Sequence, residues 1–98
     1  MSKKLPVMRD EKKYLRLINW AQKRAGLTMR IVAERCCISP SYLSKILKGE
    51  RLPGRDLLCE LCIWNWCLDE EETDEILIAC GYPPIRRKEK MIWIQESI

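Results

Sequence analysis

The sequence predicts an all-α fold, a compact five-helix domain followed by a short C-terminal tail. Glycine and proline divide the 98-residue chain into helix-length pieces at Gly26, Gly49, Pro53, Gly81 and Pro83-Pro84. Within these pieces, apolar residues recur at spacings of three and four, the period of an amphipathic helix. With 47% hydrophobic residues, a chain of this length can bury one core and support one principal surface activity.

The first two predicted helices lie before residue 37. The first covers residues 10–25, and Gly26 supplies the left-handed residue that ends it. Its apolar side is formed by Tyr14, Leu17, Ile18, Ala21 and Ala25. Thr28 caps the second helix. The residues of the second helix that we expect to face inward are Val32, Ala33 and Cys36.

The third predicted helix covers residues 40–48 and has a polar side. Ser39 caps it, and Pro40 takes the first position, where a missing N–H group costs nothing. Gly49 ends it. Its inward side consists of Leu43, Ile46 and Leu47. Its outward side consists of Ser41, Tyr42, Ser44, Lys45 and Lys48.

A fourth helix is predicted over residues 55–67 and a fifth from Asp69 to Gly81. The fourth is apolar almost all round, so we expect it to be largely covered, as the central helix or as part of an interface. Asp69 and Glu72 have the spacing of a capping box for the fifth, which is acidic and buries Ile76, Leu77 and Ala79. The predicted division is an N-terminal arm (1–9), a helical domain (10–82) and a tail (83–98), in which residues 91–94 could form a short strand or a docking segment.

Charge is distributed unevenly along the chain. Residues 1–55 carry 14 Lys and Arg against 4 Asp and Glu, whereas residues 56–98 carry 4 against 10. A basic half suits an anionic partner such as nucleic acid, although a solvated basic face is an equally common explanation. No apolar run is long enough to cross a membrane, and the N-terminus lacks the apolar stretch of a secretory signal. We therefore expect a cytoplasmic protein without membrane contact.

The second and third predicted helices have the pattern of a helix-turn-helix. Ala33 is a small residue midway along the first of the pair and allows close approach, while Ile38 plugs the corner between the two. Leu43 and Ile46 anchor the second helix of the pair by its inner side. Its polar outer side is then free to enter the major groove of DNA, which is wide enough for one α-helix.

Residues 15–68 resemble the XRE family, the Cro-repressor-like helix-turn-helix proteins. The matching residues are Gly26-Leu27-Thr28, Val32-Ala33-Glu34, Ile38-Ser39, Tyr42-Leu43-Ser44-Lys45-Ile46, Gly49-Glu50-Arg51 and Pro53. The resemblance implies a lambda-repressor-like DNA-binding domain that reads double-stranded DNA as a homodimer, on half-sites about one helical turn apart. The base-reading positions it implies are Ser41, Tyr42, Ser44 and Lys45. The phosphate-contacting positions it implies are Thr28, Met29, Arg30, Lys48 and Arg51.

Three residues depart from the family pattern. Cys37 stands at the turn position where the family usually has a left-handed Gly, at a cost on the order of 1 kcal/mol. Met29 replaces a Gln that often holds phosphate, so backbone N–H groups or Arg30 must do this instead. Pro40 fills a frequent reading position with a group that donates no hydrogen bond. Specificity is therefore expected to depend on fewer side chains.

The cysteines and tryptophans each allow two interpretations. Six cysteines in a cytoplasmic chain favour reduced thiols. Cys59 and Cys62, with Cys67 or with Cys36 and Cys37, could form a zinc or redox site, but small core residues are the preferred interpretation, and we predict no metal and no cofactor. Of the four tryptophans, at least one pair lies in a subunit interface, or the indoles are partly buried with one edge in water.

These observations predict a sequence-specific transcriptional regulator, of the repressor kind, with no small-molecule ligand evident. The alternative is a protein-interaction module, such as an antitoxin or a polymerase-associated factor, that uses the fourth helix and the tail. An enzyme is not expected, because the chain has no His and no Gly-rich phosphate loop from which to build the usual catalytic constellations.

Overall fold

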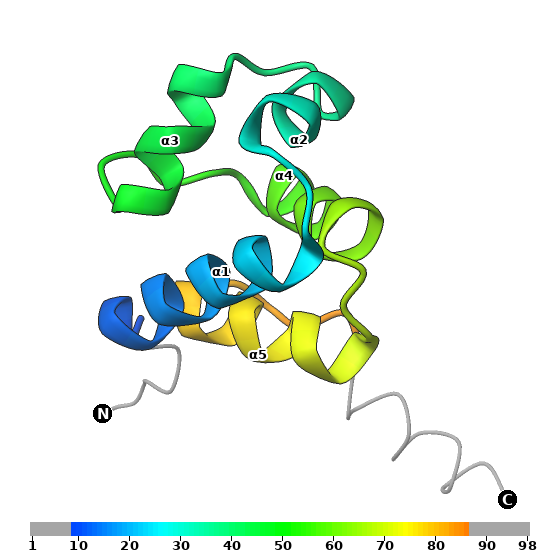
Figure 1. The fold of residues 1–98 in the computed structure, drawn as a ribbon. Helices are drawn as coiled ribbons and strands as arrows, with labels where there is room; N and C mark the ends of the chain where they lie inside the picture. Colours follow the sequence, from blue (N-terminus) through cyan, green and yellow to red (C-terminus); the bar gives the residue numbers. More distant parts are fainter. Residues whose placement is uncertain (1–8, 87–98) are drawn as a thin grey trace, which may run out of the picture.

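The computed structural model describes residues 9–86, which form the all-α, five-helix arrangement predicted from the sequence (Figure 1). The elements are α1 (Glu11–Ala25), α2 (Met29–Arg35), α3 (Pro40–Lys48), α4 (Arg55–Glu60), the π-helical segment η2 (Leu61–Asn65) and α5 (Glu70–Cys80). Most of the predicted arm and tail, including residues 91–94, lies outside the described residues. Between residues 9 and 86, no helix is long and apolar enough to cross a membrane.

Three helices, α2, α3 and α5, begin at the capping residues that the sequence predicts. Thr28 Oγ1 accepts a hydrogen bond from the Ile31 N–H at 3.2 Å, and Ser39 Oγ accepts one from the Tyr42 N–H at 3.0 Å. The capping box of α5 is complete, since the Asp69 carboxylate accepts from the Glu72 N–H and the Glu72 carboxylate accepts from the Asp69 N–H. Each contact satisfies an N–H group that has no partner inside its own helix.

The predicted glycine stops are also present, with Gly26, Gly49 and Gly81 all in the left-handed region. Gly49 is the most restrictive of the three. Its φ is 84°, and a Cβ at this position would lie 3.0 Å from Leu15 Cδ1. The end of α3 therefore approaches α1 too closely for a larger residue to fit without a shift of Leu15.

The core lies between helices that pack in a chain: α3 packs against α1 and α2, α2 also against η2, and α5 against α1, α4 and η2. In Figure 1, α1 and α5 lie side by side at the bottom, and α2 and α3 form the upper part of the molecule. The fully covered residues come from every helix: Ile18, Ala21, Val32, Ala33, Leu43, Ile46, Leu58, Leu61, Cys62 and Leu77. This set includes the residues predicted to fix α3 to the body of the protein, apart from Leu47, which is 8% exposed.

The fourth helix differs from the prediction in its pitch. After Glu60 the chain widens into η2, where the Trp66 N–H donates to the Leu61 carbonyl at 2.8 Å, one residue farther back than in an α-helix. Cys67 then takes a left-handed conformation, so the helix does not reach residue 67. Ile63 and Trp64 are 37% and 69% exposed, so the core of this chain does not cover them, and the predicted interface is the alternative left for these two residues.

Buried Asn65 bonds within the widened segment and to α2. Its Nδ2 donates to the carbonyl of Glu60 at 3.3 Å and contacts the Sγ of Cys36 at 3.2 Å. The side chain is 2% exposed, and these contacts satisfy its nitrogen only, since Oδ1 has no hydrogen-bond partner among the described residues. The hydrogen bond to Glu60 competes with the regular helix bonds of η2, and the contact with Cys36 ties this segment to α2.

Residues 83–86, the first part of the predicted tail, lie against the helices. Arg55 donates to the carbonyls of Pro83 and Pro84 at 3.0 and 3.2 Å. The Asp74 carboxylate on α5 accepts hydrogen bonds from the Ile85 and Arg86 N–H groups. The chain is therefore fixed to α4 and α5 as far as Arg86.

Candidate nucleic-acid interface

The segment from α2 to α3 folds as two short helices joined by a tight turn. Ala33 on α2 is fully covered, and its carbonyl accepts the Ile38 N–H at 2.9 Å, which closes the corner. Leu43 and Ile46 are fully covered on the inner side of α3. With that side fixed, the opposite side of α3 must face away from the core.

The turn keeps its left-handed residue although no glycine is present. Cys37 has φ of 60°, and its side chain is exposed. The conformation is one that non-glycine residues adopt at an energetic cost, as expected for a Cys at this position. The change from Gly to Cys therefore strains the turn without altering its hand.

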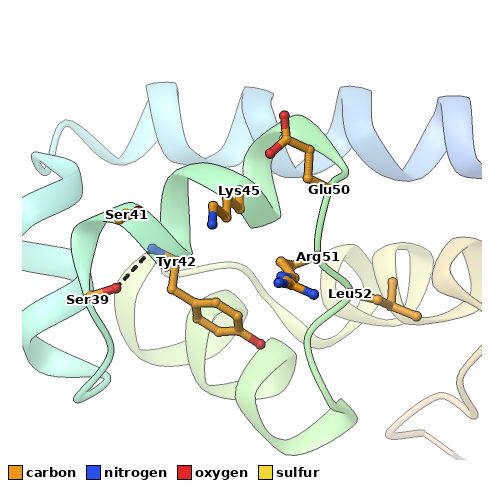
Figure 2. Close-up of a pocket in the computed structure, with 7 residues that line it drawn as sticks. All are labelled: Ser39, Ser41, Tyr42, Lys45, Glu50, Arg51 and Leu52. Carbon is orange, nitrogen blue, oxygen red and sulfur yellow. Dashed lines mark hydrogen bonds between the residues drawn. The ribbon is translucent and has the colours of Figure 1, made fainter.

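The four predicted base-reading residues lie on the outward side of α3. Ser41 and Lys45 are exposed, and Tyr42 and Ser44 are partly exposed. The ring of Tyr42 also packs against the edge of the core, so its orientation is restricted. Figure 2 shows Ser41, Tyr42 and Lys45 projecting from one side of the helix.

A shallow depression runs from this side of α3 to the loop that follows it (Figure 2). It is lined by Ser39, Ser41, Tyr42, Lys45, Glu50, Arg51 and Leu52. Ser44 does not line it. The site predicted from the sequence did not include Ser39, Glu50 or Leu52. The signal that could have found Glu50 and Leu52 is their place in the loop that follows Gly49, on either side of Arg51.

The predicted phosphate-contacting residues occupy three places. Thr28 and Arg30 are exposed at the start of α2, where the Thr28 hydroxyl already caps the helix. The Met29 side chain is partly buried against the core, which leaves its backbone N–H as the group that could meet a phosphate. Lys48 is exposed in the last turn of α3, and Arg51 lies in the depression.

This surface is basic and is separated from the acidic part of the molecule. Lys45, Lys48 and Arg51 take part in none of the ion pairs found between residues 9 and 86. The acidic first turn of α5 consists of Glu70, Glu71 and Glu72. Because α5 lies on the far side of α1 from α3, it does not neutralise the basic groups around the depression (Figure 1).

The six cysteines are free thiols and are spread through the fold. Burial raises the pKa of Cys62 to about 12 and raises the pKa of Cys36, Cys59 and Cys80 as well. Such thiols are poor nucleophiles and poor metal ligands, because both roles need the thiolate. Among residues 9–86, no group of three or more His, Cys, Asp or Glu side chains is arranged to hold a metal ion.

The tryptophans within the described residues differ in exposure. Trp66 is 1% exposed, whereas Trp20 and Trp64 are 44% and 69% exposed. The Arg24 guanidinium lies 5.2 Å from the ring centre of Trp20, within the range of a cation–π contact. Trp93 lies outside the described residues, so the predicted interface pair can be sought among Trp20 and Trp64.

Comparison with known proteins identifies a family. A family model described as a helix-turn-helix domain matches residues 16–76, which run from within α1 to within α5 and include the whole α2–α3 unit. The match confirms the helix-turn-helix resemblance predicted from the sequence. No curated protein and no solved structure shows significant similarity to the chain.

Proposed function

Because the chain belongs to the helix-turn-helix domain family, we propose that it is a sequence-specific DNA-binding regulator of transcription, acting as a repressor and without catalytic activity. The observation that carries the proposal is the orientation of α3. Its apolar side is covered by the core, and its polar, basic side carries Ser41, Tyr42, Ser44 and Lys45. An exposed helix with this composition suits the major groove.

In this proposal, α3 lies in the groove, and the last turn of α3 and the start of α2 meet the DNA backbones. Ser41, Tyr42, Ser44 and Lys45 contact base edges. Arg30, Lys48 and the N–H groups at the start of α2 contact phosphates, because a helix N-terminus attracts anions. The family resemblance implies a phosphate contact for Arg51 as well, but its positive charge is the only support for that role.

The proposal includes a homodimer on a near-palindromic operator. One α3 spans few base pairs, and a second copy doubles the number of bases read. Trp20 and Trp64 are large and exposed, and aromatic side chains of this kind are enriched in subunit interfaces. Repression is the simplest consequence, since occupancy of a promoter by the dimer is sufficient to block it.

The test is selection of bound duplexes from a random pool, followed by mobility shifts on the selected duplex and on a scrambled one. Lys45→Ala and Ser44→Ala should weaken binding to the selected duplex more than to the scrambled one. Lys48→Ala is the matched control and should weaken binding to both by a similar factor. Equal losses on both duplexes for all three variants would exclude base reading.

A second candidate is a protein-interaction module, such as an antitoxin or a polymerase-associated factor. The observation that favours it is the exposure of Ile63 and Trp64 on η2, in a helix that the sequence predicts to be covered. If the protein is an interaction module, we expect the purified protein not to be retained on heparin or genomic DNA at low salt. We then also expect Trp64→Ala to abolish binding of a specific protein, while the DNA-binding proposal expects Lys48→Ala to reduce DNA retention.

A further inference from the structure

We propose that Arg51 reads a guanine base beside α3, which makes it a specificity-determining residue and not a phosphate contact. The inference rests on the proposed DNA-binding function. It concerns the loop that follows α3, which contributes Glu50, Arg51 and Leu52 to the depression. The loop thereby becomes a second reading element next to the helix.

Arg51 lies in the depression together with side chains of α3. Figure 2 shows its guanidinium beside Tyr42 and Lys45, on the same side of the molecule as those two side chains. Lys48, in the last turn of α3, does not line the depression. Arg51 therefore shares the depression with three of the four proposed base-reading residues, Ser41, Tyr42 and Lys45.

The backbone of the loop is held in place at both ends. The N–H groups of Glu50 and Arg51 donate to the Lys45 carbonyl at 2.9 and 3.3 Å, which attaches Arg51 to the last turns of α3. Pro53 is buried, and its carbonyl accepts a hydrogen bond of 2.7 Å from the Tyr82 hydroxyl. A fixed backbone reduces the ordering cost of a two-point contact between Arg51 and a base.

The guanidinium has no acidic partner within the described residues. The ion pairs there use Arg9, Lys13, Arg24 and Arg86. Glu50 lines the same depression but is not within ion-pair distance of Arg51. The donors of Arg51 are therefore available for a ligand.

The chemistry of this group selects guanine among the bases. The planar fork of a guanidinium donates two parallel hydrogen bonds, and guanine presents O6 and N7 as paired acceptors in the major groove. Pro40 removes one donor from the start of α3, so a donor from the loop supplies a contact that the helix lacks. Lysine carries the same charge but lacks the fork, and this difference provides the test.

The experiment uses the full chain and the duplex selected from the random pool. Binding is measured for the wild type, Arg51→Lys and Arg51→Ala on the selected duplex, on a scrambled duplex, and on duplexes with 7-deazaguanine in place of one guanine at a time. Arg51→Lys should lose about tenfold or more on the selected duplex and little on the scrambled one. At one guanine, the 7-deaza substitution should weaken the wild type by about fivefold or more, and should have little effect on Arg51→Lys.

Other outcomes would overturn the role proposed for Arg51, and they can be distinguished from failure of the proposed DNA-binding function. If Arg51→Lys binds the selected duplex as tightly as the wild type, or if both duplexes lose equally, Arg51 is a phosphate contact or is idle. A selected sequence without guanine would also overturn the assignment of Arg51 to a base. In these cases selective losses for Ser44→Ala and Lys45→Ala would still support the proposed function, whereas a pool that yields no preferred sequence would overturn both. Circular dichroism of each variant confirms that the exposed substitution leaves the fold intact.

Discussion

The indole Nε1 of Trp66 donates a hydrogen bond of 2.8 Å to Oε1 of Gln22, which joins the end of η2 to α1. The same Gln22 side chain donates through Nε2 to the carbonyl of Leu27 at 2.8 Å, in the connection before α2. Trp66 is 1% exposed, so its N–H has little access to water. One amide therefore connects the largest core residue with the segment from which the helix-turn-helix unit begins.

Replacing Gln22 with Ala should destabilise the protein by about 1–3 kcal/mol, because a buried indole N–H loses its acceptor. Urea unfolding followed by circular dichroism measures the change. Lys23→Ala is the matched control, since Lys23 is exposed on the same helix and should alter the unfolding free energy by less than about 0.5 kcal/mol. Equal effects of the two substitutions would show that the Gln22 contacts contribute nothing specific.

Gly49→Ala should destabilise the protein more than Gly26→Ala. Both glycines have positive φ, so an added Cβ strains both by about 1 kcal/mol. At Gly26 nothing lies within 4 Å of the added atom, whereas at Gly49 it meets Leu15 Cδ1 at 3.0 Å. Thermal unfolding of the two variants measures the difference.

The additional destabilisation expected for Gly49→Ala over Gly26→Ala has its own control. In a Leu15→Ala background the contact is absent, so Gly49→Ala should cost about as much as Gly26→Ala does in the wild type. If the excess persists in that background, the clash with Leu15 is not its cause. If no excess appears in the wild type, the flexible Leu15 side chain moves aside without cost.

Helix starts and stops could be predicted from the sequence because their causes are local. A hydroxyl or carboxylate cap acts within three residues, and a glycine stop acts on its own backbone. Thr28, Ser39 and the Asp69–Glu72 pair show this directly. The inward side of α3 follows from periodicity alone, which is why its outward side can be named from the sequence.

The shape of η2 and the composition of the depression depend on contacts between distant parts of the chain. Asn65 bonds both to its own helix at Glu60 and to Cys36, which is far from it in sequence. Likewise, Arg51 shares a surface with Tyr42 because the loop folds back on the Lys45 carbonyl. Composition and spacing carry no information about either arrangement. The sequence therefore predicts a regular helix over residues 55–67 and a phosphate contact for Arg51.

Cys37→Gly should stabilise the protein by about 0.5–1 kcal/mol. The left-handed conformation at φ 60° costs a residue with a Cβ about 1–2 kcal/mol, and glycine adopts it without that cost, although glycine also gains entropy in the unfolded chain. Thermal unfolding measures the gain. Cys37→Ala removes the thiol but keeps the Cβ and should leave the stability nearly unchanged; a similar gain for Ala would attribute the effect to the thiol and not to backbone strain.

Stability should fall as the pH rises above about 9, with Cys62 as one cause. Burial raises the pKa of this thiol from 9.0 to about 12 in the folded protein, whereas the unfolded chain exposes it to water. A group whose pKa is higher in the folded state contributes its full stabilisation below the unfolded value and loses it as the pH rises towards the folded value. Between pH 9 and about 10.5, the unfolding free energy of the wild type should therefore drop relative to that of Cys62→Ala by about 1–2 kcal/mol.

Urea unfolding of both proteins across this range measures the drop. Tyr14 and Cys80 contribute to the absolute slope, since burial raises the pKa of each, but they are present in both proteins and cancel to first order in the comparison. A difference between the two proteins that stays constant with pH would show that Cys62 is not desolvated in the folded protein.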